Sequence, residues 1–64
     1  MSKLMRTPEV AEMLGIPEST LRWFRHTGQG PKSFRLGARR VVYLEADVTS
    51  WIQEQYDAEH KATA

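Results

Sequence analysis

The chain has no cysteine, few histidines and no long apolar run, and each shortage excludes a class of protein. Without thiols there is no disulfide, and the two histidines, His26 and His60, have no partners at zinc-ligand spacing, so we expect neither a metal nor a cofactor. The longest fully apolar run, residues 41–44, is far below the roughly 20 residues that span a membrane. With no signal peptide visible, we expect a soluble cytoplasmic protein without a membrane partner.

The length of the chain limits the number and size of its domains. A chain of 64 residues, 41% of them apolar, supports one small domain rather than an enzyme with an enclosed pocket. Ser19 and His26 lie seven positions apart on a helix surface, with nothing to exclude water, so no catalytic group can be assembled from them. The domain is predicted over residues 1–56, and the small polar residues 57–64 are expected to form a frayed or disordered tail.

Acidic residues are missing from the stretch between Ser19 and Leu44, although the whole chain carries a net charge of only +1. That stretch holds six cations, a charge of +6, while the remainder has three cations against eight acids, a charge of −5. Such a surface can be merely solvated, but a block so free of acids more often faces a polyanion. The charge pattern therefore favours a nucleic-acid partner.

The first helix is predicted at about residues 8–14. Thr7 supplies a capping oxygen, and Pro8 suits the first helical position. Gly15 has the character of a left-handed stop, with Ile16 folding back on the preceding turn.

The second helix is predicted over residues 18–27, after Pro17 and before Gly28. Leu21 and Phe24 are one turn apart and face inward. The opposite face carries side chains suited to contacting a partner: Ser19, Arg22, Trp23 and His26, with Arg25 on its edge.

A β-hairpin is predicted next, with strands over residues 33–36 and 39–44 joined by a type II′ turn at Gly37 and Ala38. Arg35, Arg39 and Arg40 make this hairpin a basic ribbon.

The last helix is predicted to begin near Glu45. Its apolar positions recur at the i, i+3, i+4, i+7 spacing of a buried stripe. The side chains expected in the core are Val48, Trp51, Ile52 and Gln55.

Two short helices, a basic hairpin and a covering helix together predict an α+β, mostly helical fold, the winged helix-turn-helix. Ala11 falls where the first two helices cross and need a small side chain, and Gly15 falls at their turn. Leu21 and Phe24 fall where the second helix packs down.

Several short motifs resemble the small MerR-like winged-helix domains, a group that includes the phage excisionases, also called recombination directionality factors, and the AlpA-type regulators. The resemblance covers about residues 4–55. Within the group, the chain is most similar to the excisionases of mycobacteriophages and other actinobacterial phages. The motifs that carry it are Thr7-Pro8-Glu9-Val10-Ala11, Leu14-Gly15-Ile16, Ser19-Thr20-Leu21, Gly28-x-Gly30-Pro31, Leu36-Gly37-x-Arg39-Arg40-Val41-x-Tyr43 and Asp47-Val48-x-x-Trp51-Ile52.

The resemblance implies a protein that acts in a bacterial host cell, binds and bends double-stranded DNA as several copies, and directs a tyrosine integrase toward excision. Two positions depart from the family pattern. Pro17 stands where a capping Ser or Thr is common, and Val42 stands where many relatives have a basic residue.

In this arrangement the second helix enters the major groove. Arg22 is the best candidate for a bidentate contact to guanine, and Ser19 and Thr20 can reach phosphate or base edges. Arg25 is expected at a backbone phosphate. Two side chains of this helix have open assignments: Trp23 either packs on a neighbouring element or stacks on a sugar, and His26 either contacts DNA or has no role.

The hairpin is the expected wing. Relatives insert it along the minor groove, where Arg39 and Arg40 adjoin the turn and Lys32 and Arg35 line the approach. Because adjacent strand residues point to opposite faces, one arginine of the pair is expected in the groove and the other along the phosphates. The sequence leaves open which one.

A single module of this kind buries only roughly 600 to 1,000 Å² on DNA and reads few base pairs. We expect head-to-tail self-association on repeated attachment sites, in which the acidic first helix or the segment 45–59 of one copy meets the basic wing of the next. No small-molecule effector is expected, because the chain ends before an effector domain or a dimerisation helix. The alternatives are a transcriptional regulator with the same fold and a module that binds an acidic protein.

Overall fold

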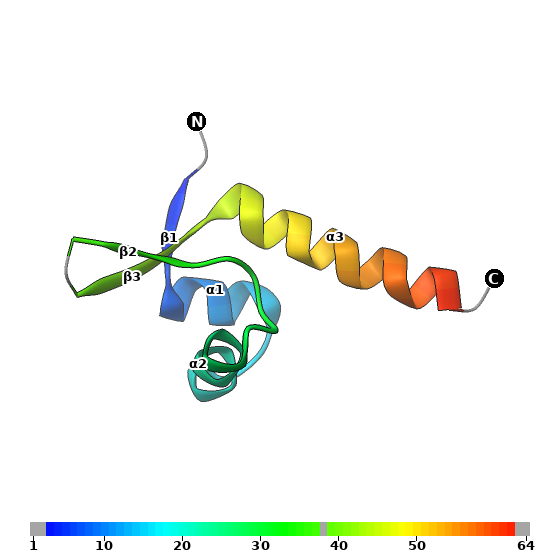
Figure 1. Ribbon diagram of the computed structural model, residues 1–64, viewed down its shortest axis with the longest axis horizontal. Helices are drawn as coiled ribbons and strands as arrows, with labels where there is room; N and C mark the ends of the chain where they lie inside the picture. Colours follow the sequence, from blue (N-terminus) through cyan, green and yellow to red (C-terminus); the bar gives the residue numbers. More distant parts are fainter. Residues whose placement is uncertain (1–2, 38, 63–64) are drawn as a thin grey trace.

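The computed structural model describes residues 3–37 and 39–62. Over these residues it has three helices and a small antiparallel sheet, which is the predicted winged helix-turn-helix (Figure 1). In chain order the elements are β1 (Leu4–Arg6), α1 (Thr7–Leu14), α2 (Glu18–Thr27), β2 (Phe34–Leu36), β3 (Arg40–Leu44) and α3 (Glu45–Ala62).

The three strands lie in the order β1-β3-β2. The sequence predicts the hairpin of β2 and β3, and β1 adds a strand that the sequence does not predict. β1 pairs antiparallel with β3, with Leu4 opposite Leu44. The sequence gives little sign of β1 because its three residues include no β-branched side chain, and its partner lies forty positions further along the chain. The hairpin strands begin one residue later than predicted, and the predicted turn type involves Ala38, which lies outside the described residues.

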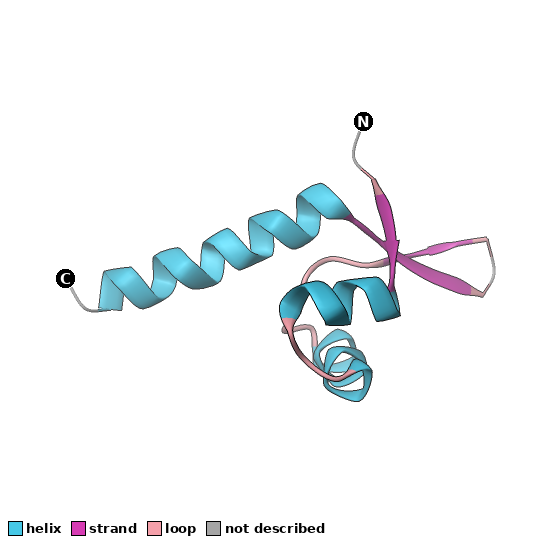
Figure 2. Ribbon diagram, turned by 180° about the vertical axis from the view of Figure 1, so that it is seen from behind, coloured by secondary structure: helices cyan, strands magenta, loops and turns pink. Residues whose placement is uncertain are grey.

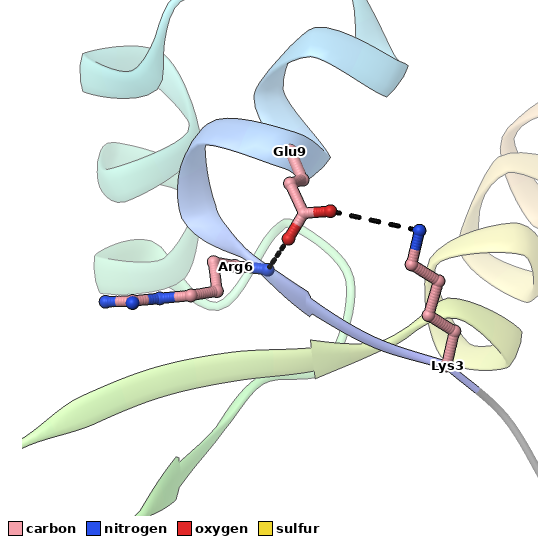
Figure 3. A network of polar contacts seen from close by, with 3 residues as sticks. All are labelled: Lys3, Arg6 and Glu9. Atoms are coloured by element: carbon pink, nitrogen blue, oxygen red, sulfur yellow. Dashed lines mark hydrogen bonds and ion pairs between the residues drawn. The ribbon is translucent and has the colours of Figure 1, made fainter.

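The start of α1 differs from the prediction. Arg6, not Thr7, is the N-cap residue, and its backbone N–H donates to the Glu9 carboxylate at 3.2 Å. Glu9 also lies 3.9 Å from the Lys3 ammonium, and the Arg6 side chain points away from both residues (Figure 3). Thr7 is instead the first helical residue, so the predicted cap is wrong, and its hydroxyl accepts a hydrogen bond from α2.

The turn between α1 and α2 is built as predicted. Gly15 has φ +72°, a left-handed conformation that costs a residue with a Cβ about 1 kcal/mol or more. Its N–H donates to the Glu12 carbonyl at 3.1 Å, and the N–H of Ile16 donates to the Ala11 carbonyl at 3.0 Å. These two bonds close the helix as a Schellman motif. The same motif ends α2, where the N–H of Gln29 donates to the carbonyl of residue 24 at 2.9 Å.

The core lies between the inner face of the sheet, α1, α2 and the start of α3. Leu21, Tyr43 and Val48 have no exposed surface, and partly buried side chains of α1, the turn and β3 pack around them. The buried cluster consists of Met5, Val10, Ala11, Leu21, Tyr43 and Val48. Val42 lies on the opposite face of the sheet, beside its paired neighbour Phe34. It is only 2% exposed and is therefore not at the surface.

Only the start of α3 packs on this core, contrary to the predicted four-residue stripe. Val48 is buried and Trp51 is half-buried, but Ile52 is 37% exposed and Gln55 is exposed. The reason is that the helix leaves the body after its second turn and projects away from it, on the side opposite the wing (Figures 1 and 2).

The expected frayed tail also differs, because residues 57–62 continue α3 as far as Ala62. Contacts one turn apart support this part of the helix: the Gln53 amide donates to the Asp57 carboxylate at 3.0 Å, and the Tyr56 and His60 ring centroids lie 4.0 Å apart. In the described part of the chain, no helix combines the length and the apolar character needed to cross a membrane.

Candidate nucleic-acid interface

The outward face of α2 presents the side chains that the sequence predicts there. Leu21 anchors the opposite face in the core, and the Gly28 motif ends the helix two residues after His26. Four predicted contact residues are exposed and Thr20 is half-buried. The exposed ones are Ser19, Arg22, Trp23 and His26.

Trp23 lies on the surface rather than under another element. Its side chain is 55% exposed, and its ring contacts the ring of the adjacent Phe24, with 5.8 Å between centroids. Of the two assignments that the sequence left open, packing against a neighbouring element is not what the structure has. The indole is therefore accessible to a partner that binds the outward face of α2.

Arg25 lies at the edge of this face, as predicted, and is half-buried. Its guanidinium donates to the Thr7 hydroxyl at 3.4 Å, which links α2 to the start of α1. It lines two hollows at once, one on each side of it, and both continue onto the wing. Arg25 is thus the residue at which the recognition helix and the wing meet.

The first hollow has a volume of about 440 Å³ and joins the end of α2 to β2. Arg35 points to it because Arg35 pairs with Val41, so both side chains lie on the inner face of the sheet, toward α2. The lining residues are Arg25, His26, Ser33, Phe34, Arg35 and Val41.

The second hollow has a volume of about 310 Å³ and joins the start of α1 and α2 to the start of β3 in the wing. Four arginines line it, against one acid, Glu18. They are Arg6, Arg25, Arg39 and Arg40. Together the two hollows form a concave, cationic surface, which we call the α2–wing surface.

Arg6 is the residue of this surface that the sequence did not single out. It lies outside the acid-free stretch, and only the pairing of β1 with β3 brings it to the wing. No local pattern could have found it, because the pairing is long-range. A lone Arg before a helix start carries no such signal.

Lys32 is the predicted wing residue that the structure does not bring to this surface. It is exposed and lines a different hollow, between the loop after α2 and α3, together with Asp47 and Glu54. The loop turns toward α3 at this point before the chain enters β2. Lys32 therefore faces acids of α3, while the other predicted wing cations flank α2.

Trp51 stabilises the connection between α2 and the wing. Its indole N–H donates to the Gln29 carbonyl at 3.0 Å, and its ring lies 6.3 Å from the ring of Phe24. Gly30 passes so close to Phe24 that a Cβ added there would lie 3.0 Å from the Phe24 Cβ. The sequence predicts Trp51 as an ordinary core residue, whereas it braces the loop that connects α2 to the wing.

Residues that could hold a metal do not gather in the part of the chain that the structure describes, where no three His, Asp or Glu side chains are grouped as ligands. The α2–wing surface offers guanidinium groups and one imidazole, and the exposed indole of Trp23 lies on the outward face of α2 outside the two hollows. Guanidinium groups in this setting suit phosphate oxygens and guanine edges.

Comparison with known proteins matches the chain to a protein family and to a phage protein. The family model described as "Helix-turn-helix domain" matches residues 4–56, which run from β1 through most of α3. A protein of Enterobacteria phage P4, named "Uncharacterized protein ORF88", is 32% identical over 50 residues, which cover 78% of this chain and 57% of that protein. The match thus spans little more than half the length of this relative. No solved structure is a significant match.

Proposed function

The chain belongs to the helix-turn-helix domain family of small DNA-binding domains, and from this premise we propose that it is an excisionase, which binds and bends attachment-site DNA and directs a tyrosine integrase toward excision. The observation that carries the proposal is the α2–wing surface, to which α2, the wing and β1 each contribute arginines. The relative in a phage and the resemblance to phage excisionases support the choice within this family.

The exposed face of α2 supports a major-groove role. Arg22 is the proposed contact to guanine, and Ser19 and Thr20, in the first turn of α2, reach phosphate or base edges. Arg25 and His26 end the same face, beside the first hollow, where they meet the backbone.

The wing supports a minor-groove role. Arg39 precedes β3 and Arg40 begins it, so both lie at the end of the hairpin that projects furthest from the body (Figure 1). We propose that α2 and the wing contact neighbouring grooves of the duplex and that binding bends the duplex between these contacts. Arg35 and Arg6 line the two hollows of the α2–wing surface.

Several copies are part of the proposal, and α3 is the element that supports it. Every side chain from Ile52 to His60 is exposed, and within this segment Ile52 and Tyr56 form an apolar pair one turn apart. The same segment carries three acidic side chains: Glu54, Asp57 and Glu59. We call the segment 52–60 the α3 arm.

A matching surface exists on the outer face of the sheet. Leu4, Phe34 and Leu36 are 45%, 42% and 46% exposed there, and Arg40 pairs with Leu36 on the same face. An acidic, partly apolar arm of one copy fits a basic, partly apolar sheet of the next. Of the two acidic segments that the sequence offered, α1 is the poorer candidate, because Glu9 is already engaged by Lys3 and the Arg6 backbone.

The test is an excision reaction in vitro with the cognate integrase and attachment-site DNA. The proposal predicts that the wild-type chain stimulates excision and protects adjacent repeats, and that Arg22→Ala needs a higher protein concentration for both. Specific DNA binding without stimulation of excision would assign the chain to the transcriptional regulators instead.

Salt titration of the affinity separates DNA binding from the binding of an acidic protein. Phosphate contacts release counterions, so the log–log slope is expected at roughly −4 to −6 if most of the cations between Ser19 and Leu44 engage. A slope near zero, or no binding to any duplex, would contradict the proposal.

A further inference from the structure

Trp23 is the large apolar side chain on the outward face of α2. It is 55% exposed, whereas tryptophan is highly buried on average in proteins. Trp51 provides the contrast within the same chain, since its ring is half-buried and its indole N–H is hydrogen-bonded to a backbone carbonyl. Single exposed apolar side chains are common on proteins, so the inference rests on where this indole lies on α2 and what lies beside it.

The position of this indole on α2 is central and fixed. Ser19, Arg22, Trp23 and His26 follow the i, i+3, i+4, i+7 spacing of one helix face, with Trp23 in the middle of it. Leu21, which is fully buried, holds the helix to the core, and the Thr27 hydroxyl donates to the Trp23 carbonyl at 3.0 Å. The indole is therefore presented at a defined place beside Arg22.

The edges of base pairs in the major groove offer one apolar group, the C5-methyl of thymine. The other groups that distinguish the base pairs there are hydrogen-bond donors and acceptors. A flat apolar ring on a helix that enters this groove has the thymine methyl as its chemical match. Resting on the proposed DNA-binding function, we propose that Trp23 reads the C5-methyl group of a thymine adjacent to the guanine that Arg22 contacts.

The test replaces each thymine of the footprinted single-site duplex, one at a time, by deoxyuridine, which keeps the base pair and removes only the methyl. Burial of one methyl-sized group corresponds to roughly 0.8 kcal/mol, or about four-fold in affinity. The wild-type chain is expected to lose about four-fold at one or two thymines. Trp23→Ala is expected to bind the thymine and deoxyuridine duplexes equally.

Two control variants identify the source of the effect. Met13→Ala removes another exposed apolar side chain, 44% exposed on α1, and is expected to keep the full methyl dependence. Trp23→Phe keeps an apolar ring and is expected to retain part of it. Circular dichroism checks that each variant is folded. We expect folded variants because the substituted side chains are exposed.

The inference is overturned if the wild-type chain binds every deoxyuridine duplex as tightly as the thymine duplex, or if Trp23→Ala shows the same methyl dependence as the wild type. An equal loss by Trp23→Ala on specific and random duplexes also overturns it, because the indole then contacts the sugar-phosphate backbone. If the wild-type chain does not prefer its site over random DNA at all, the proposed function fails together with the inference.

Discussion

The two helices α2 and α3 differ in how they are held and in what they present. α2 has ten residues, is anchored by the fully buried Leu21, and is closed by a left-handed glycine. α3 has eighteen residues but is anchored only near its start, by Val48 and Trp51. The shorter helix is thus the more firmly anchored one. Packing on the core, not helix length, therefore decides which element can position a side chain for recognition.

The same two regions separate the charges of the chain. The α2–wing surface gathers arginines from three elements, whereas the α3 arm carries carboxylates and projects in the opposite direction from the wing (Figures 1 and 2). A net charge of +1 thus conceals a molecule with a cationic and an acidic side. The separation gives each side a different partner in the proposal, DNA for one and a second copy for the other.

The largest expected effect contrasts the anchors of the two helices. Leu21→Ala is expected to lower the free energy of unfolding by about 2 to 5 kcal/mol, because it leaves a cavity in the core. That loss is a large part of the stability of so small a domain. Ile52→Ala, on the exposed arm, is expected to cost below about 1 kcal/mol. Urea denaturation followed by circular dichroism measures both, and similar losses would mean that the arm packs on the body.

The next effect divides the roles within the α2–wing surface. Arg22→Ala is expected to weaken binding to the specific duplex by about 1 to 3 kcal/mol, with a smaller effect on random DNA. Arg39→Ala is expected to weaken both by a similar amount, because the wing contacts the backbone and the minor groove. Fluorescence anisotropy at one salt concentration measures the four affinities. Equal effects of both variants on both duplexes would remove this division.

A smaller effect concerns the arm alone. Tyr56→Ser is expected to lower the coupling free energy between adjacent sites by about 1 to 2 kcal/mol, the value of burying such a side chain. Affinity for a duplex with one site is expected to stay unchanged, since Tyr56 lies on α3 and not on the α2–wing surface. The comparison requires one-site and two-site duplexes. Wild-type binding to two sites that equals binding to two isolated sites would contradict self-association.

The buried hydroxyl of Tyr43 gives a prediction of opposite sign for the core. Tyr43 has no exposed surface, and its hydroxyl has no hydrogen-bond partner among the described residues. An unsatisfied buried hydroxyl is costly, so Tyr43→Phe is expected to leave stability unchanged or raise it by up to about 1 kcal/mol. Thermal unfolding measures the change. A loss of stability would reveal a hydrogen bond to that hydroxyl.

The smallest effect is expected at the end of the arm. Residues 57–60 are exposed, so removal of residues 57–64 is expected to leave the melting temperature within roughly 2 °C of the wild-type value. DNA affinity for one site is expected to stay the same. A large drop in melting temperature would show that this segment docks on the body.

The local parts of the fold could be predicted from the sequence, because glycine and proline mark them. Gly15 and Gly28 end the first two helices as predicted, and α2 begins after Pro17 as predicted. β-Branched and aromatic residues on either side of the Gly37 turn placed both hairpin strands to within one residue.

The parts that depend on distant partners could not be predicted. β1 exists only because β3 pairs with it, and Arg6 reaches the wing through that pairing. The exposure of Ile52 depends on where the body ends beneath α3, which no periodicity encodes. Composition was misleading for residues 57–62, where contacts one turn apart continue the helix through small and polar residues.

The account rests most directly on which helix contacts DNA, and one measurement tests this. The amide spectrum of the ¹⁵N-labelled chain is recorded as a duplex with a single footprinted site is added. We predict shifts for Ser19–His26 of α2 and for Arg35–Arg40 of the wing, with the α3 arm unchanged. Shifts confined to the α3 arm, with α2 and the wing unaffected, would contradict the account.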